Sequence, residues 1–450
     1  MKRQSGKART TGDSGGVGQS AGAAPRLRPG PLALLLGGIF GAAVAPAWSA
    51  GFQIQEQSAS GLGVAYSGQA AAVHDAGTVF WNPAGQSLLK GSQLMASIAY
   101  IAPRTRFHND GTSTYGALGN GGQGGVSAWV PAVYASWALD PRWSLGLAVN
   151  APYGLSTEWD TAWAGQFHAI KSEIKTLNLN PTVAYRVSDA LSLGAGLSYQ
   201  QIKATLTNGA VLAPPFPSSL VGLGKVEGDD WGWGYNLGAL IDLRQGTRVG
   251  ATYRSRIKYR IEGDLSFSGF PAAIPDRPID ARVTLPDTFS LGVSHQFNPS
   301  TRLLADWTWT GWSSIPELKV VDTSSGGEVS STNLSFRNSW RLGLGVEYRV
   351  SEPWLLRAGM AFDKTPVRDA YRTPRLPDAD KTWFSLGMRY TPTGGAPWWV
   401  DVGYTYILLK DGSSSLPAPD ATAAEAARGA LSGTYKGSVN ILAAQAGWRF

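Results

Sequence analysis

The feature that most constrains this chain is an alternation of apolar residues at every second position, which recurs from about residue 92 to the end. In residues 340–350, WRLGLGVEYRV, every second side chain from Trp340 to Val350 is apolar, and residues 354–363, 381–390 and 398–408 repeat the pattern. Successive side chains of a strand point to opposite faces, so the pattern indicates strands with one apolar face. We expect an all-β protein.

The connections between these strands alternate in length. Six are short, namely Asp140–Arg142, Ser188–Ala190, Arg244–Gly246, Asn298–Ser300, Ser351–Pro353 and the slightly longer Thr391–Pro397. Seven are long and polar or irregular, near 102–127, 151–171, 207–230, 263–281, 322–334, 364–380 and 411–433. Thirteen connections join fourteen strands, and this alternation is typical of antiparallel transmembrane β-barrels. Residues 92–450 are therefore predicted to form a 14-stranded barrel.

A soluble β-sandwich would show a similar alternation. Two observations favour the barrel. Large aromatic residues stand at the ends of the apolar segments, as in the interfacial girdles of membrane barrels, for example Trp143, Trp231, Trp354 and Trp398. Segments of ten or more residues, long enough to cross a bilayer at a tilt, also recur. A sheet in lipid must close on itself, and fourteen strands enclose a lumen wider than side chains alone can fill. Small residues of the expected inner face, Gly194, Gly196, Gly232, Gly234 and Gly238, widen it further.

The first 49 residues are predicted to be a signal peptide. A basic leader precedes the apolar run PLALLLGGIFGAAVA and small residues that end AWSA, so cleavage is expected after Ser49 or Ala50. The alternative, a transmembrane anchor, requires a longer apolar run without Gly and Pro. The leader carries +5 of the formal net charge of +7, which leaves the rest nearly balanced and gives no argument for nucleic acid binding. The chain has no cysteine and therefore no disulfide framework.

Residues 50–91 do not alternate. They are rich in Gly and Ala and include the turn-forming pair Asn82-Pro83, as well as Phe80, Trp81 and Leu88, which favour burial. Non-strand backbone is tolerated at membrane depth where the barrel shields it from lipid. We expect an N-terminal, mainly helical hatch, or plug, inside the lumen; the alternative is a flexible periplasmic tail.

From residue 50 onward the chain resembles the FadL-type outer-membrane transporters, which include long-chain fatty acid importers and monoaromatic hydrocarbon uptake porins. The motifs that carry the resemblance are AGFQIQEQSASGLGVAYSGQAAAVHDAGTVFWNPAG (50–85), PYGLSTEW (152–159), LPDTFSLGV (285–293), ADWTWTGWS (305–313) and DKTPVRDAYRTPRLPDADKTWFSLG (363–387). The resemblance implies ligand capture at the extracellular face, an N-terminal hatch, and release through a lateral gap at a kinked third strand, near 143–152. The family's Asn-Pro-Ala motif corresponds to Asn82, Pro83 and Ala84, and we expect these residues and Phe52 to gate the route.

Ligand contacts are expected in two loops that are apolar for exposed segments, 207–223 and 263–275. The candidates there are Phe216, Leu220, Phe267 and Phe270. Alternatively, the two loops pack on each other as lids. A stripe of basic residues, Arg254, Arg256, Lys258 and Arg260, is expected on the inner wall, either as a solvated lining or as an attraction for a carboxylate headgroup.

No enzyme, cofactor or metal site is predicted. His74 and Asp75 are adjacent, but a catalytic pair is defined by geometry, and no pair of the four histidines has metal-ligand spacing. The expected function is passive uptake of a hydrophobic molecule across the outer membrane, most simply a long-chain fatty acid. The alternatives are uptake of a monoaromatic hydrocarbon and a structural or adhesive barrel. The expected partners are outer-membrane lipid and lipopolysaccharide, and the assembly machinery through the C-terminal Phe450; a monomer is expected.

Overall fold

The computed structural model describes residues 50–211, 220–243, 245–271 and 273–450. The predicted signal peptide and Phe216 lie outside the described residues.

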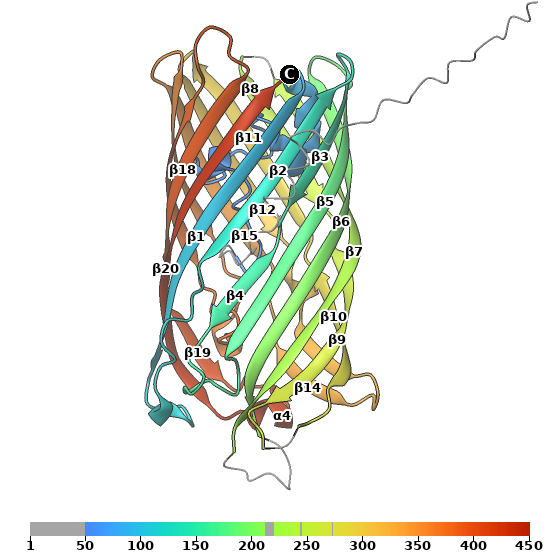
Figure 1. The fold of residues 1–450 in the computed structure, drawn as a ribbon. Helices are drawn as coiled ribbons and strands as arrows, with labels where there is room; N and C mark the ends of the chain where they lie inside the picture. Colours follow the sequence, from blue (N-terminus) through green and yellow to red (C-terminus); the bar gives the residue numbers. More distant parts are fainter. Residues whose placement is uncertain (1–49, 212–219, 244, 272) are drawn as a thin grey trace, which may run out of the picture. The chain divides into compact units, whose positions relative to one another are not determined.

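The described residues are mostly β-strand (Figure 1). The strand segments are β1 (Gln93–Asn109), β2 (Ala128–Ala138), β3 (Trp143–Asn150), β4 (Gly154–Glu158), β5 (Lys171–Arg186), β6 (Leu191–Ala210), β7 (Gly222–Leu243), β8 (Thr247–Arg254), β9 (Ile257–Ser268), β10 (Arg277–Leu285), β11 (Thr288–Asn298), β12 (Thr301–Thr310), β13 (Glu317–Asp322), β14 (Glu328–Asn333), β15 (Ser339–Arg349), β16 (Trp354–Asp363), β17 (Lys381–Tyr390), β18 (Trp398–Leu409), β19 (Gly412–Leu416) and β20 (Leu431–Arg449). The helices are short: α2 (Ala59–Leu62), α3 (Thr78–Trp81), η1 (Pro83–Leu88), η2 (Gly116–Leu118), η3 (Trp312–Ser314), η4 (Asp369–Tyr371) and α4 (Ala423–Ala426). None of the helices in the described part of the chain is long and apolar enough to cross a membrane.

The strand segments form one closed antiparallel wall. Strand β1 pairs with β2 on one side and with β20 on the other, which closes the sheet. Twelve of the segments are halves of interrupted strands, namely β3–β4, β8–β9, β10–β11, β12–β13, β14–β15 and β18–β19. Counting each pair once gives fourteen strands, so the predicted 14-stranded antiparallel barrel is confirmed.

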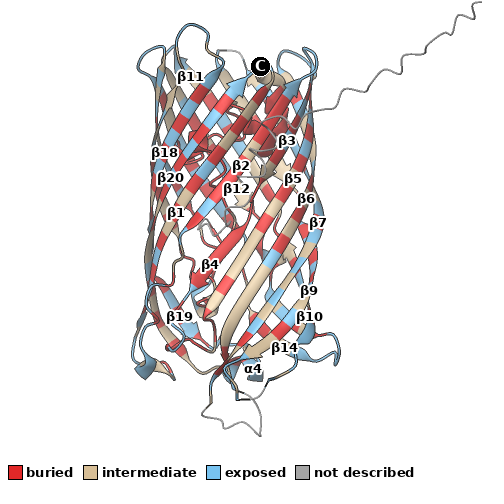
Figure 2. Cartoon of the chain, in the orientation of Figure 1, coloured by how far each residue is buried: buried red, intermediate tan, exposed pale blue. Residues whose placement is uncertain are grey.

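The outer face of the wall is apolar. Its exposed side chains alternate with buried ones along each strand, and Figure 2 shows the resulting checkered pattern. Aromatic side chains gather at both ends of the apolar band. Trp143, Trp354 and Trp398 lie near the short turns, Trp231 lies toward the long loops, and each is at least 36% exposed. This surface matches the lipid-facing side of a membrane barrel.

Several segments that were expected to be long loops extend the strands instead. Residues 102–109, 222–230 and 263–268 belong to β1, β7 and β9. The outward positions of these extensions are mostly charged or polar. They therefore lack the apolar alternation that identified the membrane-spanning parts of the strands. The wall therefore continues beyond the apolar band on the side of the long loops.

Two neighbouring strands exchange their inner and outer faces part-way along. In β8 the odd-numbered Ala251 and Tyr253 lie on the outer face, whereas in β9 the odd-numbered Ile257, Tyr259 and Ile261 are 4–5% exposed and point inward. The interruption at Ser255–Arg256 causes the exchange, because a one-residue irregularity moves every following side chain to the opposite face. The hydroxyl of Ser255 accepts a hydrogen bond from the backbone N–H of Tyr235 over 2.8 Å, which satisfies that donor beside the break.

The adjacent strand changes faces at the same level. Phe289 and Leu291 of β11 point outward, whereas Val283 and Leu285 of β10 are buried inside. The two breaks are joined by an ion pair, with Arg256 Nε 3.0 Å from Asp287 Oδ1. On the long-loop side of this level the lumen is lined by the apolar side chains of β9 and β10, and the charged side chains point outward.

This exchange corrects the expected basic stripe. Arg254 faces the lumen, but Lys258 and Arg260 of β9 lie on the exposed outer face, and Arg256 at the break is also exposed. The simple alternation of residue numbers failed here because it assumed an unbroken strand from residue 249 to 262.

Residues 50–91, here called the hatch, lie inside the barrel, drawn in blue in Figure 1. They form α2, α3, η1 and turns, and nearly all of them are buried. Helix α2 packs against β17, β18 and β20, and η1 packs against β5, β6 and β7. Such packing across the lumen fits the close approach that the small residues of this segment permit.

Candidate ligand site and hatch

An apolar cavity of about 480 Å³ lies on the side of the long loops. Strands β6, β7, β9, β13 and β14 and helix α4 contribute its walls. Its apolar lining comprises Tyr115, Phe167, Leu206, Val211, Val226, Leu265, Phe267, Leu318, Val320 and Val329. The cavity has the size and the predominantly apolar lining of a small-molecule site.

Two arginines, Arg375 and Arg428, supply the positive charge of this cavity. Arg375 donates to Ser172 Oγ over 3.0 Å and to Asn208 Oδ1 over 3.3 Å. Arg428 donates to Thr332 Oγ1 over 3.0 Å. Among the described residues, neither guanidinium has a carboxylate within ion-pair distance. The cavity thus combines an apolar wall with two cations that form no direct ion pair, although Glu425 and Glu328 lie near enough to offset part of the charge of Arg428.

Burial makes this positive charge costly. Burial, followed by the charge of Arg428, lowers the pKa of Arg375 to about 9. Burial also lowers the pKa of Arg428. A bound anion offsets such a cost by forming charge-assisted hydrogen bonds. The cavity is therefore suited to a molecule with a long apolar part and one acidic group.

A continuous cluster of apolar side chains extends through the lumen from this cavity to the hatch. It includes Leu265 and Val320 of the cavity, then Ile261, Tyr259 and Ile257, and ends at Phe52, Tyr153 and Trp312. The ring of Phe52 packs edge-on against Trp312, with centroids 4.9 Å apart, and against Tyr153 at 6.0 Å. Apolar packing thus continues from the cavity to the hatch, with no charged side chain in the cluster.

The third strand is interrupted beside Phe52. Strand β3 ends at Asn150 and β4 begins at Gly154, with Pro152 between them. The hatch pairs with this break, because Ile54 N donates to Pro152 O over 2.8 Å and Gly154 N donates to Phe52 O over 2.9 Å. The second strand, β2, pairs with β3 only from Val133 onward, so β2 and the third strand part at the level of the break.

The Asn82-Pro83-Ala84 motif begins η1, which packs against β3 and against β5, β6 and β7 beside it. Asn82 Nδ2 donates to Ala70 O over 2.6 Å and to Ala239 O of β7 over 3.1 Å. Arg254 also holds this part of the hatch, since its Nη2 donates to Phe80 O over 2.9 Å. This contact occupies Arg254 within the hatch interface, away from the cavity.

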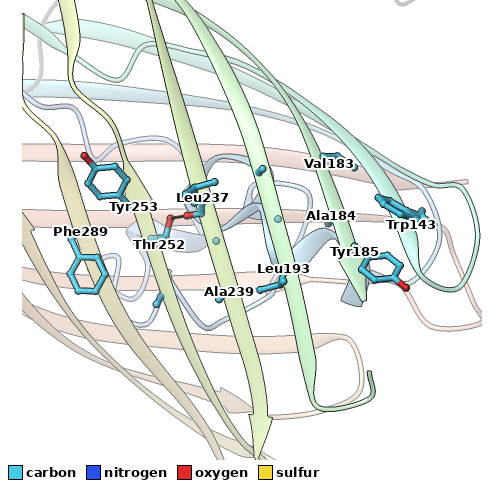
Figure 3. A pocket seen from close by; sticks show the side chains of 14 residues that line it. Trp143, Val183, Ala184, Tyr185, Leu193, Leu237, Ala239, Thr252, Tyr253 and Phe289 are labelled. Carbon is cyan, nitrogen blue, oxygen red and sulfur yellow. Dashed lines mark hydrogen bonds between the residues drawn. The ribbon is translucent and has the colours of Figure 1, made fainter. Parts of the chain in front are cut away.

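Wall glycines make the close approach possible. A Cβ atom at Gly194 would lie 2.3 Å from Ala84 N, and one at Gly238 would lie 2.0 Å from Asn82 Oδ1. On the lipid side of these same glycines the wall has a shallow apolar groove, with Trp143 and Tyr185 at one end and Tyr253 and Phe289 at the other (Figure 3). Only one layer of backbone separates the hatch from the lipid there.

A network of ion pairs joins the hatch to the wall toward the short turns. Asp75 Oδ2 lies 2.7 Å from Arg389 Nη2, and His74 Nε2 lies 3.2 Å from Glu347 Oε1. Arg357 bridges Glu347 and Asp401. The adjacent residues His74 and Asp75 therefore contact different wall residues. An apolar molecule could pass this level only by displacing buried, paired charges, which is unfavourable.

Of the other sequence candidates, Phe267 lines the cavity, and Phe270 packs on Phe267 with ring centroids 6.4 Å apart. Leu220 is half-buried just before β7. Arg256 faces away from the lumen. Arg375, Arg428 and Trp312 were not among the predicted site residues. Trp312 and Arg375 lie within the motifs 305–313 and 363–387 that carry the family resemblance, whereas Arg428 was marked only as a basic residue of the long segment 411–433.

The fold and this lumen define an outer-membrane transport barrel. Residues 41–450 match the model of the family described as "Outer membrane protein transport protein (OMPP1/FadL/TodX)". The chain belongs to this family. It is an outer-membrane transporter of hydrophobic compounds and not an enzyme.

Two of the similar proteins are named for different substrates, a long-chain fatty acid and toluene. The long-chain fatty acid transport protein of Escherichia coli O6:H1 is 31% identical over 395 residues, covering 80% of this chain and 87% of the relative. Outer membrane protein P1 of Haemophilus influenzae is 29% identical over 409 residues, covering 80% and 86%. The crystal structure of a Pseudomonas aeruginosa FadL homologue superposes with a TM-score of 0.82 at 25% identity, covering 89% and 100%. The Pseudomonas putida toluene transporter TodX gives 0.68 at 17% identity, covering 88% and 99%, and shows the fold alone.

Proposed function

We propose that this transporter takes up long-chain fatty acids passively. The observation that carries the proposal is the pair of arginines, Arg375 and Arg428, in the apolar cavity beyond the membrane. A fatty acid has one carboxylate for these cations and an alkyl chain for the apolar wall. An aromatic hydrocarbon has no group that requires them.

The route runs from the cavity along the apolar cluster to Phe52 and then sideways through the wall. The support for this route is that a barrier of paired charges lies beyond Phe52 in one direction, whereas a break in the wall lies beside it in the other. The direction toward the short turns is occupied by the paired charges of Asp75, Arg389 and Arg357. The sideways direction meets the break between β3 and β4, where the hatch backbone itself pairs with the broken strand.

The hatch gates this route. Ligand that reaches Phe52 competes with its packing on Trp312 and Tyr153, and the adjoining backbone pairing with residues 152–154 is released. Movement of Asn82, Pro83 and Ala84 from the wall accompanies the opening. No energy-coupling step is needed, because a fatty acid diffuses down its own concentration gradient into the membrane.

Uptake of radiolabelled oleate and of toluene tests the proposal in cells that lack their own transporter. The chain should increase oleate uptake, and Arg375→Gln/Arg428→Gln should lower the gain at limiting oleate by at least about a hundredfold, since two charge-assisted hydrogen bonds of about 1.5–3 kcal/mol each are lost. The matched control is Arg106→Gln/Lys436→Gln, which removes two exposed cations that oppose each other on β1 and β20. A gain in toluene uptake alone would contradict the fatty acid proposal and favour a monoaromatic hydrocarbon channel. Gain of neither substrate by a folded barrel would contradict both.

A further inference from the structure

The long connection between β16 and β17 contains a loop that is buried instead of exposed. Residues 372–378, here called the buried loop, are buried except for Arg375, which is half-buried. Connecting segments normally run over the surface of a protein. The buried loop instead contacts three elements of the transport route, namely the ligand cavity, the broken third strand and the start of the hatch.

The first part of the buried loop lies between the ligand cavity and the broken strand. The side chain of Arg375 lines the cavity. Its own carbonyl oxygen accepts a hydrogen bond from Thr157 Oγ1 at the end of β4 over 3.2 Å. The carbonyl oxygen of Pro374 accepts one from Trp159 Nε1 over 3.0 Å. This cation of the cavity therefore stands on backbone that is bonded to the outer half of the third strand.

The last part of the buried loop holds the start of the hatch. Asp378 is fully buried, and its Oδ2 accepts a hydrogen bond from the backbone N–H of Gly51 over 3.0 Å. Gly51 lies directly against Trp312, since a Cβ atom at this glycine would be 2.5 Å from the indole ring. The ring of Phe52, the next residue, packs on the same indole. The Asp378 carboxylate therefore fixes the hatch one residue before the side chain that is expected to gate the route.

A short and internally bonded stretch of chain joins these two parts. Only Leu376 and Pro377 separate Arg375 from Asp378. The side chain of Leu376 is buried and belongs to the apolar cluster that extends from the cavity to the hatch. Arg372 Nε donates to Asp378 O over 2.9 Å, which holds the end of the loop to its beginning. Closely packed interiors transmit displacements, so a shift of Arg375 is passed to Asp378.

The acceptors that hold Arg375 are weaker than a carboxylate. Among the described residues its guanidinium donates to uncharged groups, namely Ser172 Oγ, Asn208 Oδ1 and the carbonyl oxygen of Lys171. Hydrogen bonds in which the acceptor is ionised are roughly twice as strong. A carboxylate in the cavity therefore draws the guanidinium away from β5 and β6.

We propose that the buried loop couples the carboxylate of a bound fatty acid to the hatch, with Asp378 as the positioning residue. This inference rests on the proposed function. When the carboxylate draws Arg375 into the cavity, the loop follows, and the hydrogen bond between Asp378 and Gly51 N breaks. Phe52 then leaves Trp312. The protein has two states, one with this bond and no ligand, the other with ligand and no bond. A neutral molecule of the same length enters the cavity without causing the change.

Hydrogen–deuterium exchange of residues 51–57 tests the coupling in the full-length protein in detergent. In the parent, oleate should accelerate this exchange by roughly tenfold, since a hydrogen bond to a charged group is lost. Methyl oleate, which keeps the alkyl chain and has no carboxylate, should leave the rate within about twofold of the ligand-free value. Competition with a fluorescent fatty acid measures the oleate affinity of the same samples.

The first variant removes the bond that the ligand has to break. Asp378→Ala/Lys381→Met removes the acceptor together with its ion-pair partner, which would otherwise stay buried without it. Exchange should be fast without ligand, and oleate should change it by less than about twofold. Because coupling is reciprocal, oleate should also bind roughly tenfold more tightly than to the parent. A merely structural role of Asp378 would loosen the hatch without tightening oleate binding.

The second variant interrupts the link and leaves both of its ends in place. Leu376→Ala should still bind oleate, but exchange of residues 51–57 should stay at the ligand-free rate. Val367→Ala is the matched control, because Val367 is buried in the same cluster and the same connection but lies outside the buried loop. It should keep the oleate response. Heat-dependent mobility on a gel verifies that each variant is a folded barrel.

Three results would overturn the coupling: equal acceleration by oleate and methyl oleate, a full oleate response in Leu376→Ala, or a loosened hatch with unchanged oleate affinity in the double variant. Oleate binding to the parent with no change in exchange would contradict the coupling alone. Absence of oleate binding by the folded parent would contradict the fatty acid proposal and, with it, the coupling.

Discussion

The side-chain amide of Asn82 donates a hydrogen bond to the carbonyl oxygen of Ala239, across the boundary between the hatch and strand β7, over 3.1 Å. Removing it by Asn82→Ala should loosen the hatch and leave the barrel folded, because the lost bonds are worth about 1 kcal/mol each. We expect amide hydrogen exchange in residues 78–88 to accelerate by roughly tenfold. Asn440→Ala serves as the control, since Asn440 contacts Tyr404 on the outer wall. Unchanged exchange in the hatch would show that Asn82 is not an anchor.

A single methyl group on the wall should displace the hatch. A Cβ at Gly238 would overlap Asn82 Oδ1, whereas a Cβ at Gly224 would meet no atom closer than 3.6 Å. We therefore expect Gly238→Ala to increase the frequency of open events in single-channel recordings, and Gly224→Ala to leave it unchanged. Recordings of Gly238→Ala that match the parent, from protein shown to be folded, would contradict the role assigned to this contact.

A reversible cross-link should lock the hatch to the broken strand. Gln53 and Tyr153 form an antiparallel bridge, and opposing residues in such a bridge lie within disulfide range. Because the chain has no cysteine, Gln53→Cys/Tyr153→Cys can form only the intended bond within one molecule. We expect oleate uptake to stop on oxidation and to recover on reduction. Leu386→Cys/Tyr404→Cys, which joins opposing residues of two wall strands, should transport in both states. Full uptake by the oxidised Gln53/Tyr153 variant would exclude movement of this segment as a required step.

Fatty acid binding should depend on the positive charge of Arg375. The guanidinium forms charge-assisted hydrogen bonds with a carboxylate, which a neutral side chain cannot replace. Arg375→Gln should therefore bind a fluorescent fatty acid more weakly than the parent, by roughly tenfold or more. Arg106→Gln, which removes an exposed cation of β1, is the control and should leave the affinity unchanged. Equal affinity of the Arg375→Gln variant and the parent would exclude Arg375 as a carboxylate ligand.

The number and direction of the strands could be predicted because each wall strand carries its own apolar face and each turn its own composition. The exchange of faces at Ser255–Arg256 could not, because alternation gives the face of a residue only relative to its neighbours in an unbroken strand. Arg254 and Arg260 therefore seemed equivalent in the sequence, although one contacts the hatch and the other faces outward.

The positively charged part of the ligand cavity also depends on contacts that local patterns do not record. Arg375 donates to Ser172 and Asn208, which lie 203 and 167 positions away in the chain. Only closure of the barrel brings these loops and strand ends together. The hatch could be predicted from the sequence, because its Gly and Ala content and its Asn82-Pro83 turn distinguish it from the strands around it.

The break at Ser255–Arg256 also bears on how barrels of this kind can diversify. On its short-turn side, the strand presents odd-numbered side chains to lipid. On its long-loop side, the odd-numbered side chains line the ligand route. A single-codon insertion or deletion at such a break would move apolar side chains from the lipid-facing surface to the lumen, or the reverse, without changing the number of strands. The break thus allows the lipid-facing surface and the ligand-facing surface of one wall to change independently.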